Sequence, residues 1–575
     1  MIKRIITPIF ILLFSPQIFA QGQTAAAQHW ADSVYKKLSK DERIAQLMVV
    51  RLSTIDSKTK TVTFYDDKVE VLINKYNIGG ICVFQGSPVK QATIINRLQS
   101  KARTPILMCI DAEWGVGMRL IDSVLPLPRQ MMLGAMKDET VVYRYGQLVA
   151  AQCKRIGLQV NYAPVMDVNN NPNNPVINDR SFGEDKYKVA AFGIQYMKGM
   201  QDAGVMACAK HFPGHGDVAV DSHFDLPVIN KTMTQLDALE LYPFRKIFDA
   251  GVGSVMLAHL YIPAIDTTAN RATSLSPLNI NGLLRTKMNY QGLTFTDALE
   301  MQGVKKYFPG GTASVQSLIA GNDMLCLPGD VPIAIKETKN AIKKKQLSWA
   351  GIEMHCKKVL VAKYMYGLAQ LQHINTDNLA ADLNDGVPAM RRLVAENAIT
   401  LVSKKNSSFF PLRDTNPGDI AFVGFGITQE NELAKRMRLD YNATLFYAGD
   451  TGLLTKLKPF KKIVIGIHNV GRFAATNFGF TKSSLDLLAT IQQKENSISF
   501  LFGNAYALKN MCTVTNMVLC YEDDAIVQGT AADLLQGKIF YKGVLPVTVC
   551  DNLTYGFGIE TKATASLFEK ANQEK

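Results

Sequence analysis

The clearest absences in this 575-residue sequence concern apolar runs, cysteine spacing and basic patches. Beyond residue 20, no segment is long and apolar enough to cross a bilayer. The nine cysteines are odd in number and irregular in spacing, which argues against a disulfide framework, although one pair is still compatible with them. Five of them lie in apolar, strand-like runs and are expected to be buried free thiols: Cys82, Cys109, Cys208, Cys326 and Cys520.

A nucleic-acid site is also missing. The net charge is +13, but it is spread along the chain, and no basic cluster is interleaved with aromatic residues. What is present is the composition of an ordinary globular protein, with 47% hydrophobic and 20% charged residues, so extensive disorder is excluded. The length favours two or more domains.

The N-terminus has the pattern of a secretory signal. Lys3 and Arg4 precede a short apolar run over residues 5–14, and a cleavage point follows at Ala20. The sequence therefore predicts a signal peptide at 1–20, a periplasmic or secreted protein, and no stable membrane insertion after cleavage. An uncleaved membrane anchor is the alternative, whereas a lipid-anchored form is not expected because no cysteine lies near the cut.

Eight short apolar runs alternate with helical stretches over residues 40–365. Continuous apolar runs are typical of strands buried on both faces of a parallel sheet. Eight of them over some three hundred residues predict an α/β fold with a (β/α)₈ barrel, whose active site lies at the carboxyl ends of the strands. The runs are Leu47–Val50, Gly80–Phe84, Ile106–Asp111, Val160–Pro164, Met206–His211, Ser254–His259, Leu293–Asp297 and Asp323–Leu327.

A second α/β domain is predicted after the barrel. Residues 366–390 are polar and indicate a linker, and strand-like runs resume within 391–560, ending in a closing edge strand at Gly543–Val549. Five earlier runs predict an open sheet with helices on both faces: Ile399–Val402, Ile420–Gly424, Ile463–Ile467, Ile498–Phe502 and Met517–Cys520. Residues 21–39 form an N-terminal segment, and 561–575 a polar tail.

The densest cluster of titratable groups follows the fifth apolar run. It contains Lys210, His211, His215 and Asp217, and continues with Asp221-Ser222-His223. Glycines at 214 and 216 interrupt regular structure, so the cluster is expected in a loop at the barrel mouth, where chemistry is a better explanation than packing.

Paired acid groups at one barrel mouth permit retaining glycoside hydrolysis. Asp297 ends a strand and is the candidate nucleophile. His223 is the candidate acid/base, because Asp221 lies two residues before it and can hold the imidazole, raise its pKa and fix its tautomer. The histidine could then protonate the leaving oxygen and later deprotonate water.

These residues occur in motifs that resemble the β-N-acetylglucosaminidase branch of glycoside hydrolase family 3. The motifs keep the family's order and cover the whole barrel, and the second domain resembles the family's C-terminal α/β sandwich more loosely. They are Ile110-Asp111-Ala112-Glu113, Arg180-Ser181-Phe182-Gly183, Lys210-His211-Phe212-Pro213-Gly214-His215-Gly216, Asp221-Ser222-His223 and Thr296-Asp297-Ala298-Leu299-Glu300-Met301.

The resemblance implies an exo-acting enzyme that removes one non-reducing β-linked N-acetylglucosamine with retention. Asp297 would form the covalent intermediate, and the Asp221–His223 dyad would act as acid/base. Substrates would be peptidoglycan fragments or chitin-like oligosaccharides, and no cofactor or metal is expected. The implied sugar-binding residues are Asp111, Arg119, Arg180, Lys210 and His211.

One motif departs from the family's pattern, and several residues have more than one interpretation. The family usually has Gly-Gly where this chain has Trp114-Gly115, and Trp114 is interpreted equally well as a sugar-stacking or a packing residue. His259 is interpreted equally well as a pocket residue or a structural residue. For His215 a loop-shaping role is favoured, and for Glu300 a supporting or capping role.

Other functions stay open at this point. A β-glucosidase or a phosphorylase on the same scaffold is compatible with the sequence, since a histidine acid/base becomes neutral and would not repel phosphate. A zinc site built from His211, His215, Asp221 and His223 is disfavoured, because proline and glycine break the spacing. A carbohydrate-binding protein without catalysis is less consistent with intact Asp297, Asp221 and His223.

Overall fold

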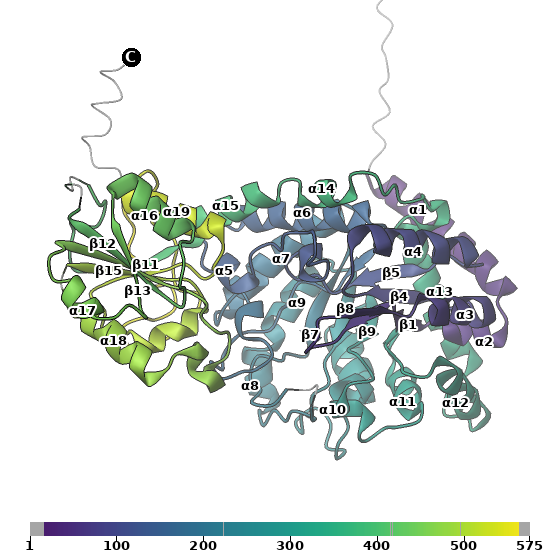
Figure 1. The fold of residues 1–575 in the computed structure, drawn as a ribbon. Coiled ribbons are helices and arrows are strands. Elements are labelled where there is room, and N and C mark those ends of the chain that lie inside the picture. The colour runs from purple at the N-terminus through teal and green to yellow at the C-terminus, as the bar shows by residue number, and fades with distance from the viewer. Residues whose placement is uncertain (1–15, 222–223, 414–415, 417, 495, 563–575) are drawn as a thin grey trace, which may run out of the picture.

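The computed structural model describes residues 16–221, 224–413, 416, 418–494 and 496–562. Two bodies lie side by side in Figure 1: a large barrel surrounded by helices and a smaller sheet domain formed by the C-terminal part of the chain. In the part of the chain that is described, no helix combines the length and apolarity that a membrane span requires.

The first body is an eight-stranded parallel barrel, as predicted. Its strands pair in the order β10-β1-β4-β5-β6-β7-β8-β9, and a parallel bridge between Phe295 and Met324 brings the two ends together. All eight predicted runs contain a strand, and β4, β5, β7, β8 and β9 are buried at every residue. The bounds are β1 (Met48–Arg51), β4 (Gly80–Val83), β5 (Leu107–Ile110), β6 (Val160–Asn161), β7 (Met206–Phe212), β8 (Ser254–Leu257), β9 (Leu293–Thr296) and β10 (Leu325–Cys326).

Helices surround the barrel, and several begin at a residue that caps them. Ser87, Asp185, Asp330 and Ser348 each accept a hydrogen bond from a backbone N–H of the first turn. The helices are α1 (Pro16–Lys37), α2 (Lys40–Ala45), α3 (Asp66–Tyr76), α4 (Pro88–Lys101), α5 (Gln130–Gly134), α6 (Thr140–Arg155), α7 (Lys186–Asp202), α8 (Met233–Ala238), α9 (Leu241–Asp249), α10 (Gln302–Lys305), α11 (Thr312–Ala320), α12 (Val331–Lys343) and α13 (Trp349–Met365).

Short elements complete the barrel. A hairpin, β2 (Ser53–Ile55) with β3 (Val62–Phe64), follows β1. The remaining elements are the single-turn helices η1 (Val116–Met118), η2 (Asn178–Arg180), η3 (Thr273–Leu275) and η5 (Leu368–Gln370), and the π-helix η4 (Leu278–Lys287). The predicted signal peptide lies mostly outside the described residues, and α1 begins at Pro16, within its last five positions.

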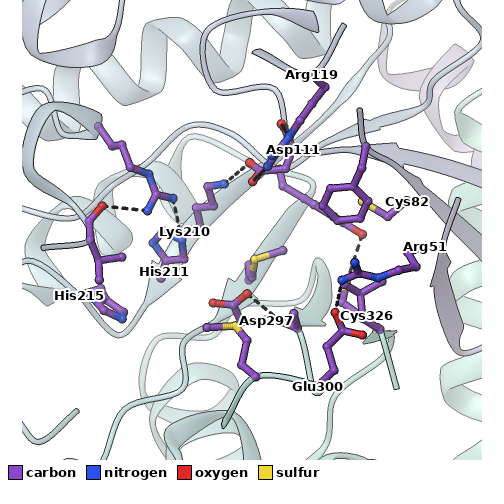
Figure 2. A pocket seen from close by; sticks show the side chains of 18 residues that line it. Arg51, Cys82, Asp111, Arg119, Lys210, His211, His215, Asp297, Glu300 and Cys326 are labelled. Carbon is purple, nitrogen blue, oxygen red and sulfur yellow. Dashed lines mark hydrogen bonds and ion pairs between the residues drawn. The ribbon is translucent and has the colours of Figure 1, made fainter. Parts of the chain in front are cut away.

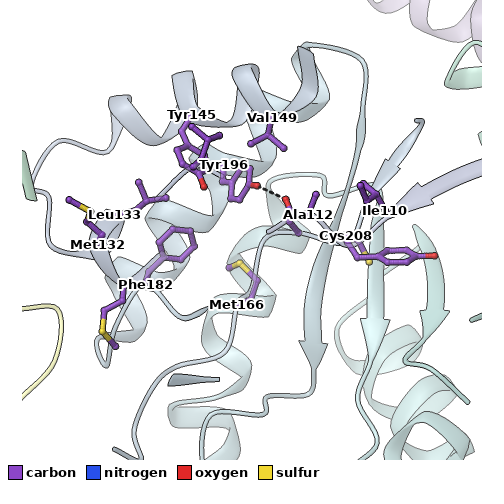
Figure 3. Close-up of a cluster of buried hydrophobic side chains, with 14 of the residues drawn as sticks. Ile110, Ala112, Met132, Leu133, Tyr145, Val149, Met166, Phe182, Tyr196 and Cys208 are labelled. Carbon is purple, nitrogen blue, oxygen red and sulfur yellow. Dashed lines mark hydrogen bonds between the residues drawn. The ribbon is translucent and has the colours of Figure 1, made fainter. Parts of the chain in front are cut away.

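The apolar core between the barrel and α6 and α7 supports the loops above β5 and β6. Tyr145 and Tyr196 meet edge to face, with ring centroids 5.3 Å apart. The Tyr196 hydroxyl donates to the backbone carbonyl of Glu113 at 2.8 Å. Figure 3 shows these rings beside Phe182 and Met166. The packing therefore fixes the backbone that carries Glu113.

The second body is a six-stranded sheet in the order β11-β16-β15-β14-β12-β13, parallel except for β11. The chain reaches this body through α14 (Leu379–Asn384), which packs against α4 and α6 of the barrel. The elements of the second body are α15 (Val387–Ala398), β11 (Thr400–Lys404), β12 (Ile420–Phe425), α16 (Glu432–Tyr441), β13 (Thr444–Tyr447), α17 (Leu453–Lys456), β14 (Lys462–Ile467), η6 (Ala474–Gly479), α18 (Lys482–Gln492), β15 (Ser497–Leu501), η7 (Ala505–Asn510), β16 (Asn516–Leu519) and α19 (Ala525–Gln536).

The region predicted as a linker is helical in part. It contains α14 and the start of α15, and Gln152 of α6 donates to the Leu383 carbonyl at 2.7 Å. Leu379 and Leu383 are buried, so this segment lies against the barrel.

Two features of the sheet differ from the sequence prediction. The edge strand β13 was not predicted, because its edge position leaves it half-buried and does not require a long apolar run. The predicted closing strand at 543–549 is wrong: no strand forms there. Pro546 has no N–H to give to a ladder, and its carbonyl accepts from the Glu184 N–H of the barrel at 3.1 Å.

Cysteine placement follows the prediction. Seven cysteines are free and buried, including all five named from apolar runs. One disulfide joins Cys512 to Cys550, with Cα atoms 6.2 Å apart. It ties the loop after η7 to the segment that contacts Glu184.

Candidate active site

A cavity of about 260 Å³ opens at the carboxyl ends of the barrel strands. The strand ends supply Asp111, Lys210, His211 and Asp297, where the barrel prediction placed them, and also Arg51, which the sequence did not single out. Every described lining residue belongs to the barrel. The lining consists of Arg51, Cys82, Phe84, Asp111, Arg119, Tyr162, Val176, Arg180, Lys210, His211, His215, Met256, Asp297, Ala298, Glu300, Met301, Cys326 and Leu327.

Two consecutive residues of β7, Lys210 and His211, both line the cavity. Neighbouring residues of a regular strand point to opposite faces. The register between β7 and β8 shifts between Ala209 and Phe212, and this irregularity allows both side chains to face the site.

Asp111 lies between two cations. Lys210 Nζ contacts Asp111 Oδ1 at 2.5 Å, and Arg119 Nη2 contacts Asp111 Oδ2 at 2.5 Å. Burial alone would raise the pKa of Asp111, but the charges of Lys210 and Arg119 outweigh it and hold that pKa below its usual value. The three groups are therefore charged and fixed in orientation.

Glu113 extends this network and was not assigned a role from sequence. It is fully buried, and Lys210 Nζ contacts its Oε1 at 2.7 Å. Arg180 donates two hydrogen bonds to the same carboxylate, from Nη2 at 2.6 Å and from Nε at 2.9 Å. Burial would raise the pKa of Glu113, but Arg180 and Lys210 keep it low. Glu113 thus joins two predicted sugar-binding cations.

Asp167, also missed, holds the ring of His211 and the backbone of His215. Its Oδ2 lies 2.7 Å from His211 Nδ1, and its Oδ1 accepts the backbone N–H of His215 at 2.7 Å. Burial would raise the pKa of Asp167, but the contact with His211 lowers it. Burial and the neighbouring His211 lower the pKa of His215 to about 4, so its ring is neutral at neutral pH.

Asp297 directs its carboxylate into the cavity, as Figure 2 shows. Its Oδ1 accepts the Ala298 N–H at 2.7 Å. His259 is buried and contacts the Ala298 carbonyl through Nε2 at 3.0 Å and the Ser274 hydroxyl through Nδ1 at 2.7 Å. His259 therefore stabilises the turn after β9, which is the structural one of the two roles that the sequence left open.

Glu300 lines the cavity itself, and it forms an ion pair with Arg51. Burial raises the pKa of Glu300 even though Arg51 opposes the shift. Its side chain is thus a third carboxyl group at the cavity, beside Asp111 and Asp297, whereas the sequence favoured a supporting or capping role.

The predicted acid/base loop follows β7. His223 lies outside the described residues. Asp221 forms a turn in which its carbonyl accepts the Phe224 N–H at 3.0 Å, and it is not among the described lining residues. Lys231 closes the base of the loop on Asp217 at 2.8 Å. Asp225 contacts Lys306 at 3.3 Å, so the loop is also tied to the chain that follows Asp297.

Trp114 is a packing residue in this structure. The guanidinium carbon of Arg129 lies 5.0 Å from its ring centroid, and the ring is not part of the cavity lining. Among the described residues, no three His, Cys, Asp or Glu side chains are grouped closely enough to hold a metal ion.

Comparison with known proteins places this site in a family. The chain is 32% identical over 384 residues to "Beta-hexosaminidase A" from Pseudoalteromonas piscicida, a match that covers 61% of this chain and 64% of that relative. A glycoside hydrolase family 3 β-N-acetylglucosaminidase from Paenibacillus sp. str. FPU-7 superposes with a TM-score of 0.72 at 26% identity, covering 90% of this chain and 100% of that one.

A third comparison concerns the fold alone. Beta-glucoside phosphorylase BglX superposes with a TM-score of 0.77 at 20% identity, covering 93% of this chain and 98% of that one. The sequence profile described as "Glycosyl hydrolase family 3 N terminal domain" matches residues 39–362, the barrel with its site. This match spans more than half of the sequence, and the chain therefore belongs to glycosyl hydrolase family 3.

Proposed function

We propose that this protein is an exo-acting retaining β-N-acetylglucosaminidase. The observation that carries the proposal is the Asp297 carboxylate, which faces a cavity whose opposite wall holds charged but paired groups. The β-hexosaminidase and β-N-acetylglucosaminidase relatives support the choice of sugar. Because the match covers 64% of the Pseudoalteromonas relative, the activity of the whole protein remains part of this proposal.

The sugar-binding wall suits a neutral substrate. Asp111 can accept hydroxyl hydrogen bonds, while Arg119, Arg180, Lys210 and His211 can donate them. Each of the four donors already has a carboxylate partner, so the wall offers oriented hydrogen bonds without a large net charge. Such a wall can hold the terminal sugar with its anomeric carbon toward Asp297.

Two displacements then complete the reaction. In the first, an Asp297 oxygen bonds to the anomeric carbon, the glycosidic C–O bond breaks, and His223 gives its proton to the leaving oxygen. In the second, His223 removes a proton from water, the water oxygen bonds to the anomeric carbon, and Asp297 is released. Two inversions give net retention.

The acid/base assignment rests on sequence and on the loop that carries it. Asp221 precedes His223 by two residues, within reach of the imidazole in a turn. The loop is anchored at Asp217 and Asp225. A carboxylate beside the imidazole would favour its protonated form before the first step.

The first test is release of a chromogenic phenol from β-N-acetylglucosaminide and β-glucoside, each with and without phosphate. We expect turnover of the N-acetyl sugar alone, indifferent to phosphate. A preference for the glucoside would make the protein a β-glucosidase, and dependence on phosphate would make it a phosphorylase. Either result would overturn the proposal.

The nucleophile is tested separately. Asp297→Ala should abolish turnover without changing the melting temperature, and proton NMR of the wild-type reaction should show the β-anomer first. Retained turnover in Asp297→Ala, or the α-anomer as first product, would contradict the assignment.

We further propose that residues 1–20 direct export and that the natural substrates are peptidoglycan fragments or chitin-like oligosaccharides. The basic start, the apolar run and Ala20 support export. Intact-mass measurement after expression with export machinery should give a chain that begins at Gln21. A mature chain that still carries Met1 would refute cleavage.

A further inference from the structure

The single-turn helix η2 separates two cavities. Arg180 lines the active-site cavity, whereas its neighbour Asp179 lines a second cavity of about 280 Å³ between the two domains. Consecutive residues thus face different cavities. Any force that moves the backbone at Asp179 also moves Arg180.

The second domain holds η2 directly. Arg472 forms a two-point ion pair with Asp179, with Nε 2.9 Å from Oδ2. The Arg472 carbonyl accepts the side-chain amide of Asn178 at 3.0 Å, and the amide of Asn504 donates to the Asn178 side chain at 2.5 Å. Because Arg472 and Asn504 follow the parallel strands β14 and β15, the carboxyl edge of the second sheet is directed at η2.

The backbone at η2 needs such support. Asn178 has φ of +42°, in the left-handed region that costs energy for residues other than glycine, although asparagine tolerates it best. Its side chain is satisfied by the second domain, and its carbonyl accepts from Asn169 at 2.8 Å. The conformation that places Arg180 is therefore stabilised from outside the barrel.

Asp179 is 6% exposed, so its carboxylate oxygens obtain their hydrogen bonds from the protein. Arg129 of the barrel supplies one contact at 2.9 Å, and Arg472 supplies two. Loss of Arg472 leaves one guanidinium for a buried carboxylate, and the turn is free to shift toward Arg129.

We propose that Arg472 of the second domain is a positioning residue for Arg180 in the substrate site. The inference rests on the proposed function only in taking Arg180 to contact the terminal sugar. The second domain then contributes to substrate binding while lining no described part of the active-site cavity.

The test is steady-state kinetics of Arg472→Ala on the aryl glycoside that the wild type hydrolyses. We expect KM to rise about ten-fold, while kcat changes less than about three-fold, because a binding contact is weakened and the reacting groups are untouched. Arg472→Lys keeps the positive charge but loses the planar two-point contact, so its KM should lie between those of the wild type and Arg472→Ala. Lys137→Ala, which removes an exposed ion pair with Glu560 at another interdomain contact, should match the wild type.

A second mutation separates positioning from general damage. In an Arg180→Lys background, Arg472→Ala should add less than about two-fold to KM, because its effect passes through the Arg180 side chain. If Arg472→Ala does not fold, Asn504→Ala is measured in the same way and should raise KM about three-fold. Unchanged KM in a folded Arg472→Ala, or full additivity with Arg180→Lys, would overturn the inference. Absence of wild-type turnover on any glycoside would instead refute the proposed function.

Discussion

Lys363 gives a prediction whose size follows from its burial. It lies in α13, is fully buried, and donates from Nζ to Gln46 Oε1 at 2.6 Å. The described residues include no carboxylate within ion-pair distance of it. Burial lowers the pKa of Lys363 to about 7, against a usual value of 10.5, and Cys356 and Cys109 oppose this shift without cancelling it.

The direction in which stability changes with pH follows from proton binding. Between about pH 7 and 10.5 the unfolded chain holds a proton on Lys363 that the folded chain has released, so this residue makes stability rise with pH across that window. At roughly 1.4 kcal/mol per pKa unit, the cost to the folded state is about 4 kcal/mol at pH 7 and about 2 kcal/mol at pH 9.

Lys363→Met removes this cost and keeps most of the volume. We expect its melting temperature to exceed that of the wild type at pH 7, and the underlying gain in stability to shrink by about 2 kcal/mol between pH 7 and pH 9. Loss of the Gln46 contact lowers the gain equally at both pH values, so the pH dependence carries the test. Lys482→Met, at a side chain 88% exposed, is the control and should show no such trend. A melting difference that is the same at both pH values would refute the reasoning.

Three further predictions concern the site. Glu113→Gln should lower kcat/KM for an aryl β-N-acetylglucosaminide and destabilise the barrel by roughly 3–5 kcal/mol, because two buried cations lose their shared anion; unchanged kinetics and melting temperature would contradict the network. Asp167→Asn should raise KM several-fold and lower the melting temperature, since the His211 ring loses a charged acceptor and the new amide N–H faces another buried donor; an unaltered KM would exclude the orienting role. Dialysis against a chelator should leave activity intact, and loss that zinc restores would revive the metal hypothesis.

Much of the barrel was readable from sequence because its strands are buried on both faces. Runs such as Gly80–Phe84 and Met206–His211 are continuous and apolar, and each ends in a residue that lines the cavity. The strand β13 escaped detection because an edge strand has no such requirement. Residues 543–549 were wrongly predicted as an edge strand, because their apolar side chains pack in the domain although their backbone does not join the sheet.

The site was predictable to the extent that strand ends reveal it. Asp111, Lys210, His211 and Asp297 follow or end apolar runs and do line one cavity. Asp167 lies six residues beyond the end of β6, so strand position could have identified it.

Other parts of the site depend on contacts that no local pattern records. Glu113 was quoted within a motif, but its partners come from distant β7 and η2. The contact between Arg472 and Asp179 joins residues almost three hundred positions apart, and only the packing of two domains brings them together.

The arrangement of the cysteines has a consequence for oxidative folding. Burial raises the pKa of the seven free thiols, and only a thiolate attacks a disulfide. In the native state, the bond between Cys512 and Cys550 therefore has no competitor within the chain. A chain oxidised before its barrel closes would instead expose six barrel thiols to exchange. If the barrel closes before Cys512 and Cys550 are oxidised, its six thiols are withdrawn from exchange and scrambled pairing is avoided.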